Sequence, residues 1–172
     1  MMRSCLLLLA GSLLLSITGN SQDRKQDSQS MNESLLRMNR MLVENETKRI
    51  NEFIERHQYH MSRTGTGLRY EIYRQVEGKS PDSGNVVEIK YRIFLLDGTL
   101  CYSSDSTGAA KLRIGSGEQV TGLEEGLLMM SPGDRARLIL PAHMAYGMSG
   151  DRNRIPPGQA LFYDLEMLSV SK

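Results

Sequence analysis

The chain has 172 residues, a length that predicts one domain with appended segments. Hydrophobic residues make up 40% and charged residues 24%, which is typical of a globular protein. With 21 basic and 20 acidic residues, the net charge of +1 excludes the strong positive field that holds nucleic acid or an anionic membrane surface.

Residues 1–21 have the pattern of a secretory signal peptide. Arg3 supplies the positive end, and the apolar run from Leu6 to Leu15 is too short to span a bilayer. Cys5 precedes this run instead of following it, which argues against a lipid anchor. We therefore expect export, with the periplasm as the compartment and no membrane span in the mature chain. A permanent membrane anchor is the alternative.

Residues 22–30 are polar and predict a linker, and residues 31–64 then predict an N-terminal amphipathic helix. Its apolar residues form one narrow stripe, which Asn45 and Glu46 interrupt. Such a stripe has to be covered, so we expect it to dock on the following domain or to pair residues 31–62 with a second copy in a homodimer. Direct capture of a client protein is a third interpretation. The stripe consists of Leu35, Met38, Leu42, Ile50, Phe53 and Met61.

From Leu68 onward the period of the sequence changes from helical to alternating. Four segments alternate apolar and polar residues, as strands do when one face of an antiparallel sheet is buried. Turn signals rich in Pro, Gly and Asp separate them, and only Gly122–Met130 looks helical. The pattern predicts an α+β fold in which a twisted antiparallel sheet closes over one short helix. The alternating segments are residues 68–72, 87–95, 135–140 and 161–167.

Motifs for other chemistries are incomplete. Glycines 115, 117 and 122 do not have the GxGxxG spacing of a dinucleotide site, and no Lys-Ser or Lys-Thr pair follows them. His57 and His60 are three residues apart, but no carboxylate or thiolate cluster completes a metal site. Beyond the signal peptide Cys101 is the only cysteine, so no internal disulfide is expected. We expect neither a metal nor a cofactor.

The C-terminal half carries a series of short segments in a specific order. These are VVEIKY (86–91), DGT (97–99), IGSGE (114–118), TGLEEG (121–126), MSPGDRA (130–136), AYG (145–147), IPP (155–157) and LFYDLEML (161–168). Together they resemble the FKBP family of peptidyl-prolyl cis-trans isomerases, immunophilins that bind the macrolide tacrolimus. The resemblance covers residues 65–172, the expected isomerase domain. The preceding helix and RTGTGLRY (63–70) resemble exported bacterial members, including those associated with gliding motility.

The resemblance implies a five- or six-stranded sheet half-wrapped around a short helix, with a pocket between them for a proline-containing segment of a client protein. It implies that the backbone N–H of Val120 binds a substrate carbonyl. It also implies that Tyr146 directs its hydroxyl toward the carbonyl of the isomerising bond. The other pocket residues that it implies are Tyr91, Cys101, Tyr102, Gln119, Leu123, Ile155 and Tyr163.

The chemistry of isomerisation fits such a pocket. Amide resonance sets a rotation barrier of ~18–20 kcal/mol, and the cis and trans X–Pro isomers are nearly balanced in energy. No covalent bond breaks, so no nucleophile or metal is required. The twisted transition state loses the charge separation of the planar amide, and an apolar cavity therefore favours it over the ground state. Two fixed hydrogen-bonding groups would orient the substrate.

Three positions depart from the family pattern. Where members usually read Asp-Gly-x-x-Phe-Asp-Ser, Cys101 replaces an aromatic wall and Tyr102 replaces the pocket acid. Leu123 replaces the usual aromatic floor, and Asp105 is a nearby acid that could substitute for the missing one. We therefore predict an isomerase of low activity that assists the folding of exported proteins. A non-catalytic FKBP-fold chaperone, or a binding module for proline peptides, is the alternative.

Overall fold

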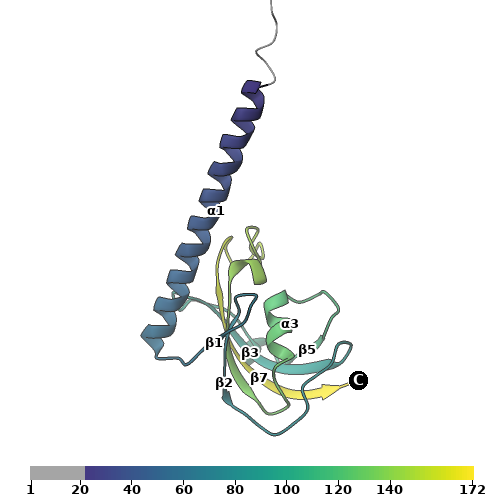
Figure 1. The fold of residues 1–172 in the computed structure, drawn as a ribbon. Coiled ribbons are helices and arrows are strands. Elements are labelled where there is room, and N and C mark those ends of the chain that lie inside the picture. Colours follow the sequence, from purple (N-terminus) through teal and green to yellow (C-terminus); the bar gives the residue numbers. More distant parts are fainter. Residues whose placement is uncertain (1–21) are drawn as a thin grey trace, which may run out of the picture. The chain divides into compact units, whose positions relative to one another are not determined.

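The computed structural model of the protein describes residues 22–172, with side chains from residue 29 onward, so the expected signal peptide lies outside the described residues (Figure 1). In chain order the elements are α1 (Gln22–His57), β1 (Ser62–Arg63), β2 (Arg69–Arg74), β3 (Val86–Leu95), β4 (Leu100–Ser103), α2 (Ser104–Thr107), β5 (Ala110–Arg113), α3 (Thr121–Leu127), β6 (Arg135–Leu140), the 3-10 helix η1 (Ala142–Met144) and β7 (Leu161–Ser171). No helix within residues 22–172 combines the length and the apolar content needed to cross a membrane.

The N-terminal helix differs from the sequence prediction at both ends. It begins at Gln22, so the expected linker at residues 22–30 is helical. That segment has no Gly or Pro and contains Gln, Lys and Arg, which favour helices. The helix ends at His57 instead of residue 64, because Gln58 adopts the left-handed conformation with φ of 56°. Tyr59 can then stack on Phe162 of the sheet.

The chain divides into two units, one ending at Leu42 and the other comprising Val43–Lys172. All side chains of residues 29–42 in the first unit are exposed. The second unit begins before residue 65, the expected start of the domain, because Ile50 and Phe53 of α1 belong to a core of this unit.

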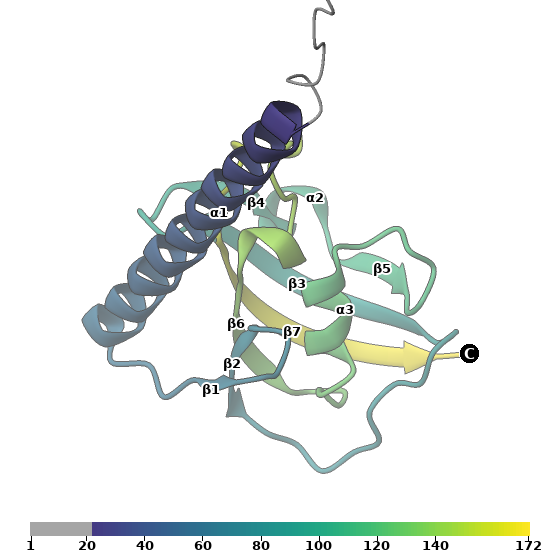
Figure 2. The same cartoon turned by 45° about the horizontal axis from the view of Figure 1, so that its top comes forward.

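All strand pairs of the sheet are antiparallel, in the order β1-β2-β6-β7-β3-β4, with β5 also pairing with β3 (Figure 2). The sheet has seven strands, since it includes the two-residue β1. The long strands β3 and β7 form its centre, paired from Val86↔Ser171 to Leu95↔Leu161. An antiparallel sheet with a short helix, preceded by an N-terminal helix, confirms the predicted fold class.

One face of the sheet carries the main core under α3. Leu138 and Leu140 of β6 and Tyr163 of β7 point to this face, because alternate residues of a strand share a face. Gly122 and Gly126 of α3 lie against β6, where an added Cβ would collide with the side chains of Leu140 and Leu138. These glycines therefore let α3 pack closely against β6.

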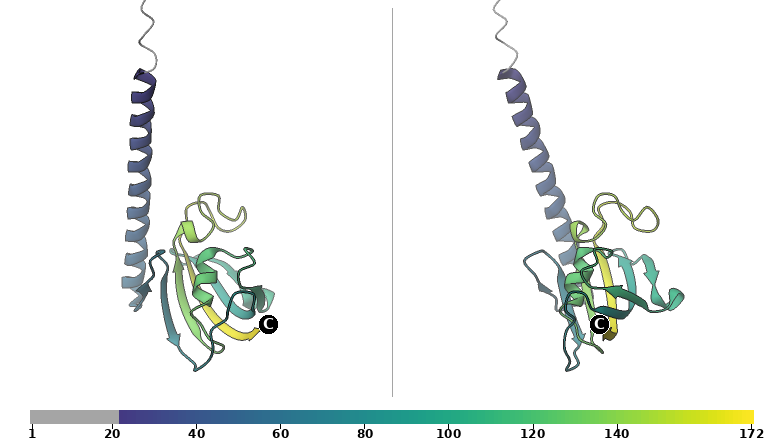
Figure 3. Two further views of the ribbon diagram at one scale, coloured as in Figure 1. Left: turned by 45° about the vertical axis from the view of Figure 1, so that its right-hand side comes forward. Right: turned by 90° about the vertical axis from the view of Figure 1, so that its right-hand side faces the viewer.

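The opposite face is divided into an apolar part and a charged part. Ile139 and Phe162 are buried there in one cluster with Ile50 and Phe53, which are 2% and 4% exposed. The C-terminal end of α1 lies beside the sheet (Figure 3). The C-terminal part of the apolar stripe therefore docks on the sheet, as one of the two favoured interpretations predicts.

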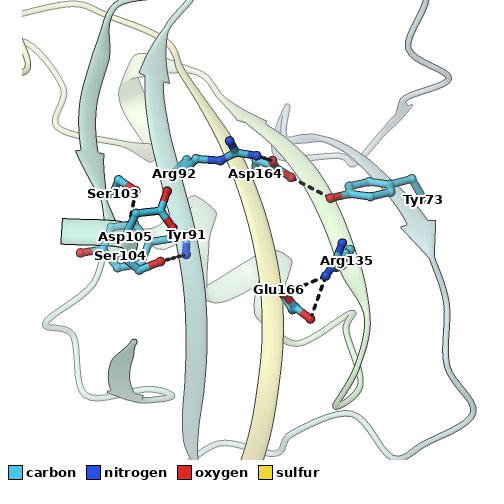
Figure 4. A network of polar contacts seen from close by, with 9 residues as sticks. All are labelled: Tyr73, Tyr91, Arg92, Ser103, Ser104, Asp105, Arg135, Asp164 and Glu166. Carbon is cyan, nitrogen blue, oxygen red and sulfur yellow. Dashed lines mark hydrogen bonds and ion pairs between the residues drawn. The ribbon is translucent and has the colours of Figure 1, made fainter. Parts of the chain in front are cut away.

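The charged part of this face carries rows of alternating sign. Arg92 donates to Asp164 at 2.7 Å, and Tyr73 donates to the other oxygen of Asp164 at 2.9 Å (Figure 4). Arg135 donates to Glu166 at 3.2 Å in the next row. A hollow of about 220 Å³ lies among these residues. The Arg92–Asp164 and Arg135–Glu166 pairs are partly exposed to solvent, so each adds ~0–1 kcal/mol of stability.

Candidate functional site

A cavity of about 310 Å³ opens between α3 and the inner face of the sheet. This is the lower end of the ~300–1,000 Å³ typical of small-ligand sites. Ile89, Tyr91 and Ile93 reach it from β3, and the register places Tyr163 of β7 beside Ile93. Leu123 of α3 faces them from the other side. The remaining lining residues are Tyr102, Ala110, Leu112, Gln119 and Tyr146.

The tyrosines give this apolar cavity its polar groups. Burial raises the pKa of Tyr146, and the negative charge of Asp151 raises it further, so the phenol stays protonated at neutral pH. Within residues 29–172 its hydroxyl forms no hydrogen bond and is free to donate to a ligand. Burial also raises the pKa of Tyr163 far above its usual range. The Tyr91 hydroxyl lies 3.4 Å from the Thr107 hydroxyl at the rim.

An acid stands close to the position where Tyr102 replaces the family carboxylate. The Tyr102 hydroxyl donates a short hydrogen bond to Oδ2 of Asp151, in the loop after Tyr146. Oδ1 of Asp151 accepts from the backbone N–H groups of Asn153 and Ile155, both at 2.8 Å. Burial acts to raise the pKa of Asp151, but the hydrogen bonds from Tyr102 and the backbone outweigh it and hold this pKa below its usual 3.8. The carboxylate is therefore ionised at neutral pH.

Asp105 is not the substitute acid. Its backbone N–H donates to Ser103 Oγ at the start of α2, and Asp105 lines the hollow on the opposite, charged face of the sheet (Figure 4). The sequence distance is short, but the strand β4 turns into α2 here and carries Asp105 away from the cavity.

The structure brings most of the predicted site residues together. Tyr146, Val120 and Gln119 come from segments that flank η1 and α3. Val120 is the N-cap of α3, and its carbonyl accepts from Leu123 N–H at 3.0 Å. Cys101 and Ile155 are 1% and 3% exposed and belong to the core behind the cavity wall. Those predicted residues that line the cavity are Tyr91, Tyr102, Gln119, Leu123, Tyr146 and Tyr163.

Cys101 is a buried thiol with weak contacts to the carbonyls of Thr99 and Arg154, both at 3.8 Å. Burial raises the pKa of this thiol above its usual 9.0, so it stays protonated and unreactive at neutral pH. Among the described residues, no group of His, Cys, Asp or Glu side chains could hold a metal ion.

Sequence reasoning missed several residues of the site. Ile89 and Ile93 lie on the buried face of β3, and the alternation of that strand could have identified them. Ala110 and Leu112 show the same alternation in β5. Asp151 has no comparable signal, because it lies 49 residues from Tyr102 in a loop without a regular pattern.

The sequence profile of FKBP-type peptidyl-prolyl cis-trans isomerases matches residues 77–168, which contain this cavity. The chain belongs to that family. A 107-residue segment is 30% identical to the probable FKBP-type peptidyl-prolyl cis-trans isomerase FkpA of Neisseria meningitidis, covering 62% of this chain and 39% of that protein. A 91-residue segment is 41% identical to the peptidyl-prolyl cis-trans isomerase Fkbp12 of Drosophila melanogaster, covering 52% and 84%. The chain thus spans about two fifths of the Neisseria FkpA but most of the Drosophila isomerase.

Solved structures of the family have the same fold. FkpA from Escherichia coli superposes with a TM-score of 0.66 at 25% identity, covering 88% of this chain and 73% of that one. AtFKBP13 superposes with a TM-score of 0.60 at 26% identity, covering 64% of this chain and 98% of that one. The FKBP-type sheet and its short helix are therefore shared, while the residues of the cavity have to be judged from this chain itself.

The contact between Tyr102 and Asp151 predicts a pH-dependent contribution to stability. We expect Tyr102→Phe to lower the unfolding free energy at neutral pH. The pKa of Asp151 is lowered in the fold, so this contribution is present above 3.8 and is lost as the pH falls through the folded value. Urea unfolding at a series of pH values measures it, with Tyr70→Phe as the control. A difference between wild type and Tyr102→Phe that does not shrink in acid would contradict the role of the carboxylate.

Proposed function

We propose that this FKBP-family protein catalyses cis-trans isomerisation of X–Pro peptide bonds in exported proteins. The observation that carries the proposal is the apolar cavity lined by Tyr146, Leu123 and Tyr163, in which the Tyr146 hydroxyl has no hydrogen-bond partner within residues 29–172. A prolyl ring would occupy this space. The uncatalysed reaction takes tens to hundreds of seconds, which is slow enough to limit folding.

In this mechanism the cavity acts on the electronic state of the amide. The planar amide is polar, whereas the twisted transition state has lost resonance, so apolar walls stabilise the transition state selectively. Tyr146 donates to the carbonyl of the isomerising bond, and the backbone N–H of Val120 binds a second substrate carbonyl. Asp151 and Tyr102 fix the loop that follows Tyr146. These contacts supply orientation, and no proton is transferred.

The decisive measurement is the exchange rate between cis and trans forms of a Leu-Pro peptide with the full chain present. We expect acceleration above the buffer rate that rises linearly with protein concentration. No acceleration by the folded wild type would remove the enzymatic proposal.

A second candidate is a non-catalytic chaperone or a binding module for proline peptides. It is supported by the aliphatic lining at Leu112 and Leu123, which gives a prolyl ring less aromatic surface. An aggregating client protein separates the two proposals. Protection by Tyr146→Ala equal to that by the wild type, together with no isomerase activity in either, would favour the chaperone.

We propose export on the basis of residues 1–21, whose charged start and apolar run have the pattern of a secretory leader. The periplasm is then the compartment in which folding clients would be met. N-terminal sequencing of the protein from the periplasmic fraction tests this. A chain that keeps residues 1–21, or that stays in the cytoplasm, would contradict it.

We also propose that the exposed part of α1 pairs with a second copy. Met31, Leu35, Met38 and Leu42 recur at coiled-coil spacing and are 50–63% exposed. Light scattering of the full chain should give the mass of a dimer. Met38→Glu should give a monomer, because a charge buried in the seam of a coiled coil destabilises the pairing. Leu36→Glu, off the seam and 66% exposed, is the control and should stay dimeric. A monomeric wild type rules the dimer out.

A further inference from the structure

The end of α1 that docks on the sheet also touches the segment that carries Tyr146. Glu46, Ile50 and Phe53 lie at spacings of four and three residues and therefore on one side of the helix, which we call the docking row. Ile50 and Phe53 are buried against the sheet. Oε1 of Glu46 accepts a hydrogen bond from the backbone N–H of Ala142 at 2.7 Å. Glu46 is thus the polar end of an otherwise apolar contact.

Ala142 is the first residue of η1, and its N–H would otherwise lack a partner. The N-cap is Pro141, which makes no side-chain capping hydrogen bond. The first N–H groups of a helix have no partner within the helix and need an external acceptor. A carboxylate is a strong acceptor for this role, because its charge strengthens the hydrogen bond. Glu46 therefore caps η1 from a different element of the fold.

The carbonyl of Ala142 in turn accepts hydrogen bonds from the backbone on either side of Tyr146. It accepts from the N–H of Ala145 at 3.0 Å and from the N–H of Gly147 at 2.8 Å. Ala145 and Gly147 are the two neighbours of Tyr146 in the chain. Through Ala142, three hydrogen bonds therefore connect the Glu46 carboxylate to the backbone N–H groups of the two residues that flank Tyr146.

Met144, just before Tyr146, is 4% exposed and buried in the core. After Tyr146 the chain has no buried side chain until Ile155, and Met148 is 74% exposed. The Gly147 carbonyl accepts from Gly158 N–H at 2.8 Å, and the Asp151 contacts hold the middle of the loop. The Tyr146 ring packs against the main core, while the path of its backbone depends on a small number of hydrogen bonds, three of which involve Ala142.

We infer that Glu46 is a positioning residue for isomerisation, through which α1 holds the Ala142 peptide and thereby places Tyr146 at the cavity. The inference rests on the proposed function. It gives the docked end of α1 a role in the site beyond covering the sheet.

The test compares Glu46→Ala with Glu46→Gln in the full chain. Glu46→Ala should lower kcat/KM for a Leu-Pro peptide about tenfold, through kcat more than KM, because orientation of Tyr146 is lost. Glu46→Gln keeps an oxygen acceptor and should retain most of the activity. Glu52→Ala, on an exposed part of the same helix beside Lys48, is the matched control and should match the wild type. In a Tyr146→Phe background, Glu46→Ala should add little further loss.

Amide hydrogen exchange separates this inference from the proposed function. If the wild type shows no isomerase activity, the proposed function fails. Exchange at the Ala145 and Gly147 amides still measures the positioning. It should be faster in Glu46→Ala than in the wild type, with β6 and β7 amides unchanged. Three results would each overturn the inference. The first is an equal decrease of kcat/KM in Glu46→Ala and Glu46→Gln, and the second is a tenfold decrease caused by Glu46→Ala even in the Tyr146→Phe background. The third is unchanged hydrogen exchange at the Ala145 and Gly147 amides.

Discussion

Tyr146→Phe should lower kcat/KM for a Leu-Pro peptide about tenfold, the factor for one lost hydrogen bond in a site protected from water. Phenylalanine keeps the ring that lines the cavity and removes only the hydroxyl. That hydroxyl has no partner within residues 29–172 and, because burial raises its pKa, it remains a donor across the neutral range. The loss should therefore lie in the chemical step, with the stability of the fold preserved.

The matched control for this prediction is Tyr73→Phe. Tyr73 donates to Asp164 on the charged face of the sheet, away from the cavity, and its hydroxyl should not affect catalysis. Measuring both variants by exchange between the cis and trans peptide, alongside thermal unfolding, separates a pocket effect from a general one. Full activity of a folded Tyr146→Phe would assign catalysis to the apolar walls alone.

Phe53→Ala should lower the unfolding free energy by about 3–5 kcal/mol, the usual cost of removing a buried aromatic ring. Phe53 is 4% exposed, and its ring centre lies 5.3 Å from that of Phe162 and 4.2 Å from that of His57. The truncation leaves a cavity between α1 and the sheet. Because Phe53 shares the docking row with Glu46, the truncation should also weaken the hydrogen bond between Glu46 and the Ala142 N–H.

Urea unfolding gives this difference directly, with the slope of the transition as a check that the unfolded state is unchanged. Leu36→Ala is the control on the same helix. Leu36 is 66% exposed, so its removal should change the unfolding free energy by no more than ~0.5 kcal/mol. A Phe53→Ala variant as stable as Leu36→Ala would mean that α1 does not dock on the sheet in solution.

Tyr102 stands where the resemblance to the family implies a carboxylate. In this chain the carboxylate comes from Asp151, on the loop that also carries Tyr146, and it meets Tyr102 through a direct hydrogen bond. The negative charge is therefore kept near the phenol of Tyr146, where it raises the pKa of that phenol. The acid that contacts Tyr102 therefore lies 49 residues from it in the sequence.

The sequence alone determined the strands β2, β3, β6 and β7, the short helix and the inward face of β3, whereas β1, β4 and β5 were not predicted. Ile89, Tyr91 and Ile93 could be assigned to one face because side-chain direction alternates along a strand, which is a local property. Residues 122–130 were recognisable as a short helical stretch, and the structure places this helix at Thr121–Leu127. The order of the short motifs was sufficient to identify the family, since each motif serves a turn or a contact at a fixed place in the fold.

Only the tertiary structure decided the partners of the polar residues. Glu46 looks like an interruption of the apolar stripe, yet it accepts from Ala142, which is 96 residues away. Asp105 is the acidic residue nearest to Tyr102 in the sequence, yet Asp151 is the acid that accepts the hydrogen bond from Tyr102. A hydrogen bond depends on distance and angle to within fractions of an ångström, and these depend on the path of the whole chain. Apolar burial needs only the correct face, which periodicity already specifies.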